Sequence, residues 1–229
     1  GPWAFECLTI ARRLYYETYG AFDVTMASAG PAGSGTKGAE QEGSKLRFPV
    51  DLDEEDHSVG PTMSGVQVDL GGIGKGYALD RLDGILKMWS VDNALFHSGG
   101  STVRTRGKPG GKMDEWVVML RHPDTDDFIG QVPIGERALS GSGADLEGPH
   151  IIDPRTGEYS VPRRGAWALS PTAAEADALS TAFTIMSRKE IETFCAGHED
   201  VSALLLDEDG RIESVGRECG FETVENSQP

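Results

Sequence analysis

The sequence predicts an α+β protein in which helices alternate with antiparallel hairpins. Two pairs of apolar segments predict these hairpins: 115–120 with 128–133 across the turn PDTDD, and 201–206 with 211–215 across the turn DEDG. Stretches with apolar residues at helical spacing lie between them, and no repeat of fixed period is visible. This order favours mixed and antiparallel sheets over a regularly wound parallel sheet. The 229 residues suffice for one large domain or two small interleaved subdomains.

Composition and charge narrow the classes of function. The formal net charge of −16 repels nucleic acid and anionic membranes, so neither is an expected partner, and solubility alone is the plainer explanation of the charge. No apolar run approaches the roughly 18 residues of a membrane span, so we expect no transmembrane segment. The cysteines are far apart and form no Cys-x-x-Cys pair, which predicts neither a disulfide framework nor a zinc knuckle. They are Cys7, Cys195 and Cys219.

The first part of the chain predicts one helix and a loop-rich stretch. Residues 3–17 carry apolar side chains at helical spacing, and this helix ends near Gly20. From 28 to 65 the composition changes to glycine, serine, proline and acidic residues. This composition predicts a long surface loop within the domain, with a short strand at 46–50.

A glycine-rich run, DLGGIGKGYA at 69–78, joins a predicted strand to a predicted helix. Alternation of apolar and polar residues over 66–69 indicates the strand, and helical spacing from Ala78 to Trp89 indicates the helix. Such a junction lets the backbone approach a phosphate, and a helix N-terminus favours negative charge. The spacing matches neither the dinucleotide fingerprint nor the Walker loop, so a tight turn without a ligand is the alternative.

Local signals predict the remaining elements. The pairs Thr172 with Glu175 and Ser187 with Glu190 are spaced as capping boxes, and each predicts the start of a helix. The second of these helices ends at Gly197. Four further strands are predicted, at 93–97, from Thr102, at 137–140 and at 166–169.

Three oxygen-bearing side chains lie close together on the helix that begins at Thr172. Asp177 and Thr181 are four residues apart and share a face, and Ser180 is adjacent. Hard oxygens of this kind suit Mg²⁺ or Ca²⁺. The alternative is an exposed aspartate beside a threonine that hydrogen-bonds to its own helix carbonyls. His150, beside a glycine-rich loop and a tight turn, is either a catalytic or a structural histidine.

Four short segments in fixed order resemble the ApbE family, the FAD:protein FMN transferases. They are GAFDVT at 20–25, DLGGIGKGYA at 69–78, HIIDPRTG at 150–157 and ADALSTA at 176–182. Each segment is a weak signal alone, but their order over residues 20–187 is specific. The resemblance implies an ApbE-like α+β fold in a single domain over 1–229.

The resemblance also implies a set of ligand-binding residues. A Mg²⁺ ion would take the backbone carbonyl of Gly72 and side-chain oxygens of Asp177 and Thr181. Ser180 falls where some members carry a further acidic ligand of the metal. His150 matches a histidine implicated in the transfer step. FAD would be held by residues from three places in the chain: Ala21, Phe22 and Asp23, then Asp69 and Lys75, then Ile152.

The activity implied by the resemblance is Mg²⁺-dependent transfer of FMN from FAD to a serine or threonine hydroxyl of an acceptor protein, with release of AMP. The implied acceptor is a subunit of a respiratory or electron-transfer complex. The implied location is the bacterial periplasm or a membrane-associated exported form, and a chain from which no signal sequence was removed would be cytoplasmic. Two alternatives use the same residues: Mg²⁺-dependent hydrolysis of FAD by a pyrophosphatase, and FAD binding by a non-catalytic protein.

Two features depart from the family pattern. Members usually begin with strands that contain a Met-Gly-Thr segment and a further aromatic contact to FAD, whereas this sequence starts at the helix before Gly20. Ser101, after Gly99 and Gly100, stands where the family commonly has an acidic or amide residue. Both features bear on how tightly FAD is held.

Overall fold

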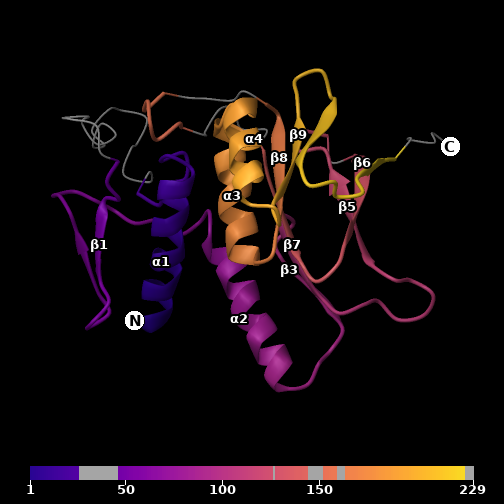
Figure 1. The fold of residues 1–229 in the computed structure, drawn as a ribbon, viewed down its shortest axis with the longest axis horizontal. Helices are drawn as coiled ribbons and strands as arrows, with labels where there is room; N and C mark the ends of the chain where they lie inside the picture. Colours follow the sequence, from indigo (N-terminus) through magenta and orange to yellow (C-terminus); the bar gives the residue numbers. More distant parts are fainter. Residues whose placement is uncertain (26–45, 126, 144–151, 159–162, 225–229) are drawn as a thin grey trace.

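The structure, a computed structural model, describes residues 1–25, 46–125, 127–143, 152–158 and 163–224. Helices and antiparallel strands alternate along these residues, which confirms the predicted α+β class (Figure 1). The helices in the described part of the chain are α1 (Pro2–Glu17), α2 (Gly74–Met88), α3 (Ala173–Ile185) and α4 (Arg188–Gly197). None of them is long and apolar enough to cross a membrane.

The described strands form three antiparallel sheets. A two-stranded sheet pairs β1 (Val50–Asp53) with β2 (Ser58–Pro61). A six-stranded sheet has the order β10-β9-β8-β7-β4-β3, and a three-stranded sheet has the order β11-β6-β5. The bounds of the six strands are Ala94–Ser98 for β3, Thr102–Arg106 for β4, Ala138–Gly143 for β7, Gly165–Ser170 for β8, Ser202–Leu206 for β9 and Ile212–Gly216 for β10. Those of the three strands are Trp116–Arg121 for β5, Phe128–Ile134 for β6 and Glu222–Thr223 for β11.

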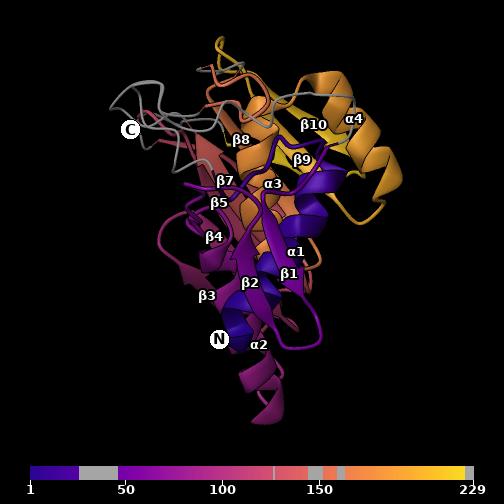
Figure 2. The same cartoon turned by 90° about the vertical axis from the view of Figure 1, so that its left-hand side faces the viewer.

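The elements stack in layers. Figure 1 shows the β1–β2 hairpin beside α1, then α3, then the six-stranded sheet, with β5 and β6 on the far side. Figure 2, turned by 90°, shows the same hairpin in front of α1, with α3 and the strands behind it. In both views α2 extends beyond the end of α1, and it contacts β3 and β4 of the six-stranded sheet. The six-stranded sheet is therefore covered on one face by helices and on the other by the three-stranded sheet.

The central strands are apolar on both sides because both faces of this sheet are covered. Ala166, Ala168 and Ala203 pack in the main core with the helices. Trp167 and Leu204, at alternate positions, pack in a second core with the three-stranded sheet. Every residue of β8 and β9 is buried. Burying each large side chain stabilises the fold by roughly 1.5–3 kcal/mol, so these two strands hold the two cores together.

Helix α3 lies at the centre of the molecule and is rich in alanine. It packs against α1, α2 and the strands β7 and β8. Small side chains let these neighbours approach closely, because little volume separates the backbones. Its fully buried alanines are Ala173, Ala174, Ala176, Ala178 and Ala182.

Helices α2 and α3 meet at their N-terminal turns and cap each other. The Asp80 carboxylate of α2 accepts hydrogen bonds from the N–H groups of Ala173 and Ala174, both at 2.8 Å. In return, the Asp177 carboxylate of α3 accepts from the N–H of Gly76 at 3.1 Å. Each helix thus satisfies N–H groups that the other helix leaves without an intrahelical partner.

The local sequence signals are confirmed at most elements. Both predicted hairpins form, as β5–β6 and β9–β10. Thr172 accepts from the N–H of Glu175 at the start of α3. Ser187 and Glu190 form a reciprocal capping box at the start of α4, which ends at Gly197 as predicted.

Two predictions about strands are wrong. Residues 66–69 are not a strand, because no described strand pairs with them, although the Asp69 N–H donates to the Val24 carbonyl at 2.7 Å. The predicted loop at 28–65 contains the β1–β2 hairpin, and its strand begins at Val50, where the prediction over 46–50 ended. Val50 is buried against α1, and this contact supplies the partner that a short strand needs. Residues 26–45 of the predicted loop lie outside the described residues.

We predict that Gly76→Ala strongly destabilises the fold. A Cβ atom at Gly76 would lie 2.0 Å from the carbonyl oxygen of Ala173, so α2 and α3 must separate. We expect a loss of about 3 kcal/mol in the free energy of unfolding, measured by urea denaturation.

Gly84→Ala, in the same helix, is the matched control. A Cβ at Gly84 meets no atom within 4 Å, so alanine should stabilise α2 by roughly 0.5–1 kcal/mol. Equal stability of the Gly76 variant and the wild type would contradict the close approach of the two helices.

Candidate functional site

The candidate site forms around the carboxylate of Asp177 on α3. This side chain is almost fully buried and accepts hydrogen bonds on both oxygens. Oδ2 accepts from the Gly76 N–H of α2 at 3.1 Å. Oδ1 accepts from the hydroxyls of Thr102 at 3.2 Å and Ser140 at 3.4 Å, which lie on β4 and β7. Three elements besides α3 therefore fix the position of this carboxylate.

Lys75 is the cationic partner of this carboxylate. Its Nζ lies 3.2 Å from Asp177 Oδ1 and donates to the Gly71 carbonyl at 2.9 Å. The lysine side chain is 38 % exposed, whereas the aspartate side chain is 4 % exposed. Helix α2 has no side-chain cap and no acidic residue in its first turn. The ammonium group and the helix N-terminus together make this surface favourable to an anion.

Thr181 and Gly72 lie side by side next to this ion pair. A Cβ placed at Gly72 would be 3.5 Å from Thr181 Oγ1, and Thr181 is partly exposed. Ser180 is different, because it is fully buried. Its Oγ donates to the Asp177 carbonyl at 2.9 Å and lies 2.9 Å from Ser142 Oγ of β7. The structure thus brings Gly72, Asp177 and Thr181 together and places the Ser180 hydroxyl in the interface with β7.

The oxygen donors at this place fit a Mg²⁺ ion. No group of three or more His, Cys, Asp or Glu side chains is arranged to hold a metal within the described ranges. A metal would therefore have one carboxylate, that of Asp177, with neutral oxygens from Thr181 and Gly72. Mg²⁺ commonly binds through one or two carboxylates, keeps several waters and takes phosphates of its substrate. The Lys75 ammonium lies between the Asp177 carboxylate and the Gly71 carbonyl oxygen, so oxygen atoms flank a cation at this position.

Two residues predicted to hold FAD have their side chains in the main core. Ala21 is 1 % exposed and Phe22 is 3 % exposed. The Phe22 ring would touch a Cβ at Gly72 at 3.4 Å, so it packs directly under the glycine-rich run. The Thr18 hydroxyl accepts from the Phe22 N–H at 3.1 Å and fixes this turn. These side chains position the turn and pack in the core, so contact with a ligand would come through backbone groups.

A backbone hydrogen bond joins the GAFDVT segment to the DLGGIGKGYA segment, and Asp23 and Asp69 lie beside it. The Asp69 N–H donates to the Val24 carbonyl at 2.7 Å, and Asp69 Oδ1 accepts from the Gly71 N–H at 2.8 Å. Asp23 Oδ1 accepts from the N–H and the hydroxyl of Thr25. Burial raises the pKa of Asp23, and these two hydrogen bonds oppose that rise. The predicted flavin segments are thus neighbours in space.

The DPRTG turn lies close to the GAFDVT segment. Ile152 is half-buried, and Arg155 is held by the Asp153 carboxylate at 2.8 Å. A Cβ at Gly20 would lie 3.8 Å from Cγ of Arg155, so this turn packs beside the start of the GAFDVT segment. The predicted catalytic residue His150 lies outside the described residues.

Cys7 of α1 is close enough to the site to sense the charge of Asp177. Burial raises the pKa of the Cys7 thiol to about 11, and the negative charge of Asp177 adds to this rise. A thiol with this pKa is protonated at neutral pH, and the thiolate is the form that acts as nucleophile or metal ligand. Cys7 packs in the main core.

Three hydroxyl residues of the site were missed in the sequence. Thr102 pairs with Ser140 in the register of β4 and β7, and their hydroxyl oxygens are 3.0 Å apart. Ser142 lies 3.4 Å from Thr181 Oγ1. The sequence held a usable signal, since serines at 140 and 142 alternate with glycines and share one face of a strand.

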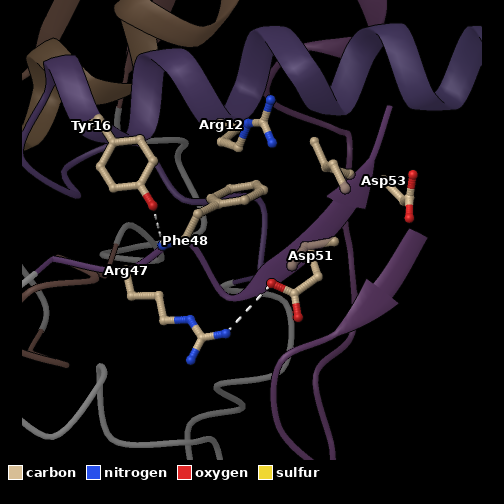
Figure 3. A pocket seen from close by; sticks show the side chains of 8 residues that line it. Arg12, Tyr16, Arg47, Phe48, Asp51 and Asp53 are labelled. Atoms are coloured by element: carbon tan, nitrogen blue, oxygen red, sulfur yellow. Dashed lines mark hydrogen bonds and ion pairs between the residues drawn. The ribbon is translucent and has the colours of Figure 1, made fainter. Parts of the chain in front are cut away.

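A surface pocket of about 380 Å³ between α1 and β1 is separate from this site (Figure 3). Its cations already have anionic partners. Arg12 pairs with Glu54 at 2.9 Å, and Arg47 points toward Asp51 at 3.5 Å. None of the predicted site residues lines this pocket, so it is not part of the candidate site.

Curated proteins named FAD:protein FMN transferase match parts of this chain. A FAD:protein FMN transferase of Klebsiella pneumoniae (strain 342) is 36 % identical over 118 residues, which are 47 % of this chain and 35 % of that protein. A FAD:protein FMN transferase of Rhodobacter capsulatus is 32 % identical over 160 residues, which are 64 % of this chain and 29 % of that protein. The chain thus spans about a third of the length of these relatives.

Solved structures match over nearly all of the chain. The ApbE protein of Thermotoga maritima has a TM-score of 0.75 and 27 % identity, covering 93 % of this chain and 75 % of that one. The flavin transferase ApbE of Vibrio cholerae has a TM-score of 0.74 and 21 % identity, covering 94 % and 75 %, and supports the fold. The family model for ApbE matches residues 1–205. The sequence match and the shared fold together show that this chain belongs to the ApbE family.

Proposed function

We propose that this chain transfers FMN from FAD to a serine or threonine hydroxyl of an acceptor protein, with Mg²⁺ bound and AMP released. Similarity to proteins named FAD:protein FMN transferase supports this proposal. The observation that carries it is the buried carboxylate of Asp177 beside the Lys75 ammonium, at a helix N-terminus without a side-chain cap. Thr181 and the backbone of Gly72 complete a set of hard oxygens next to this pair.

The proposed reaction is a displacement at phosphorus. The acceptor hydroxyl oxygen bonds to the phosphorus of FMN, the bond from that phosphorus to the bridging oxygen breaks, and AMP leaves with that oxygen. A Mg²⁺ ion would supply neutralisation of the pyrophosphate charge. Asp177 and Thr181 would hold that ion, and Lys75 would bind phosphate oxygens. His150 would take the proton of the acceptor hydroxyl, as the family resemblance implies.

The acceptor that we propose is a subunit of an electron-transfer complex, in the periplasm or at a membrane surface. The reaction is tested by incubating the protein with FAD, Mg²⁺ and an acceptor peptide that contains serine or threonine, followed by mass spectrometry. Covalent FMN on the peptide supports the transferase. Free FMN with AMP would instead show FAD hydrolysis, and intact FAD that remains bound would show a non-catalytic FAD-binding protein.

We predict that Asp177→Ala lowers Mg²⁺-dependent transfer by about 10²-fold or more. The variant loses the one carboxylate assigned to the metal, and a metal ion contributes several kcal/mol of charge stabilisation. Transfer is measured by mass spectrometry, and circular dichroism checks the fold. Asp114→Ala is the control, because Asp114 is almost fully exposed and lies 3.9 Å from Lys108. Unchanged Mg²⁺-dependent transfer by the Asp177 variant would overturn the assignment.

We predict that Gly72→Val lowers transfer more than it lowers stability. A valine side chain would crowd Thr181 Oγ1 and the Phe22 ring, and would hinder access to the Gly72 carbonyl. Gly74→Ala is the matched control, since its Cβ would make an ordinary contact with Leu70 at 3.7 Å. Transfer rates and melting temperatures are compared for both variants. Normal turnover by Gly72→Val would make the glycine-rich run a structural turn.

We predict that His150→Ala lowers the rate of transfer by roughly 10²- to 10⁴-fold, as expected for loss of a general base. Neutral imidazole accepts the proton, so the wild-type rate should fall as the pH drops below about 6.5, the ordinary pKa of histidine. The variant should lack this pH limb. Single-turnover rates against pH, with FAD titrations, provide the measurement. Weakened FAD binding with the pH limb retained would instead assign His150 a structural role.

A further inference from the structure

Oδ1 of Asp177, the oxygen beside Lys75, has no free position for a metal ion while its present partners stay in place. Oδ1 receives the Lys75 ammonium at 3.2 Å together with two hydroxyl donors, Thr102 at 3.2 Å and Ser140 at 3.4 Å. Oδ2 receives the Gly76 N–H at 3.1 Å. Each carboxylate oxygen offers about two lone-pair positions, so the three donors leave none free on Oδ1, whereas Oδ2 accepts from the backbone of α2 alone. Metal binding at Oδ1 therefore requires one of its partners to leave.

Lys75 is the partner that can leave without disturbing the fold. The hydroxyls of Thr102 and Ser140 belong to fully buried residues on paired strands. The Gly76 N–H is part of α2, where the backbone packs directly against α3. The lysine side chain is 38 % exposed, and its flexible four-carbon stem can move the ammonium group away. Its second partner, the Gly71 carbonyl, belongs to an exposed residue at the surface.

Charge balance decides when Lys75 leaves. The carboxylate and the ammonium neutralise each other, so a divalent cation added alone would leave two uncompensated positive charges beside a buried group. Like charges a few ångströms apart repel strongly where water is scarce. The pyrophosphate diester of FAD carries two negative charges and would restore neutrality. It would also give the displaced ammonium a new anionic partner, near the N-terminus of α2.

We propose that Lys75 is an exchangeable cation that occupies the site in the absence of metal, and that its transfer from Asp177 to the pyrophosphate couples the binding of metal and FAD. This inference rests on the proposed function, because it uses the same metal and the same substrate. Metal alone competes with Lys75 and binds weakly. Metal and FAD together bind tightly. FAD supplies the negative charge that compensates the metal, and the metal displaces Lys75 from Asp177 so that Lys75 can bind the pyrophosphate. Thermodynamic linkage makes the effect reciprocal, so metal must strengthen FAD binding by the factor by which FAD strengthens metal binding.

The test measures Mn²⁺ binding by electron paramagnetic resonance, in the absence and presence of FAD, with chromatography to confirm that FAD is intact. For the wild type we expect FAD to tighten Mn²⁺ binding by about 10-fold or more, within the usual range of coupling between two sites. Lys75→Met should bind Mn²⁺ without FAD about 10-fold more tightly than the wild type, and FAD should add little further. Lys75→Arg keeps the positive charge and should bind Mn²⁺ without FAD as weakly as the wild type.

Two further variants separate the possible outcomes. Lys87→Met removes an exposed lysine from the last turn of the same helix and should match the wild type. Asp177→Asn should bind Mn²⁺ weakly with or without FAD. If Asp177→Asn loses Mn²⁺ but Lys75→Met binds it no more tightly than the wild type, cation exchange is overturned and the metal assignment stands. If no protein binds Mn²⁺ under either condition, the metal assignment of the proposed function is overturned as well.

Discussion

The reciprocal capping of α2 and α3 is the constraint on which the candidate site depends. Asp80 of one helix and Asp177 of the other each accept backbone N–H groups across the contact. This geometry requires the backbones to touch at Gly76, and that contact also places Lys75 beside a buried carboxylate. The same hydrogen bond that joins the two helices therefore orients the charged group of the site. Structure and chemistry are not separable at this point in the chain.

Elements with strong local signals could be predicted from the sequence, and those that depend on a distant partner could not. The capping residues Ser187 and Glu190 form their bonds within four residues, so the start of α4 follows from sequence alone. The hairpins of β5–β6 and β9–β10 were likewise marked by their turns. Residues 66–69 alternate like a strand but have no described strand beside them, and alternation alone does not supply a partner. The predicted strand at 46–50 overlaps the observed strand β1 only at Val50, because its burial against α1 and the pairing of β1 with β2 depend on distant residues.

In the candidate site, too, pairs of residues close in sequence could be predicted, whereas contacts between distant segments could not. Asp177 and Thr181 could be paired from their spacing, because four residues on a helix return to the same face. The partnership of Lys75 with Asp177 could not be found in this way, since it depends on how two helices pack. Thr102 was missed because a single hydroxyl in a strand has no distinctive pattern, and its role appears only in its pairing with Ser140 in the register of β4 with β7. His150 falls outside the described residues, so its position is still a prediction from the sequence.

The alanine-rich interior of α3 limits the evolutionary paths open to this site. With five alanines fully enclosed, the helix cannot accept larger side chains on its inner faces without pushing α1, α2 or the sheet apart. Variation among descendants of this sequence should therefore concentrate in loops and at the rim, while the helix accepts exchanges of nearly equal volume. Changes at the rim would then leave the paired charges of Asp177 and Lys75 in place.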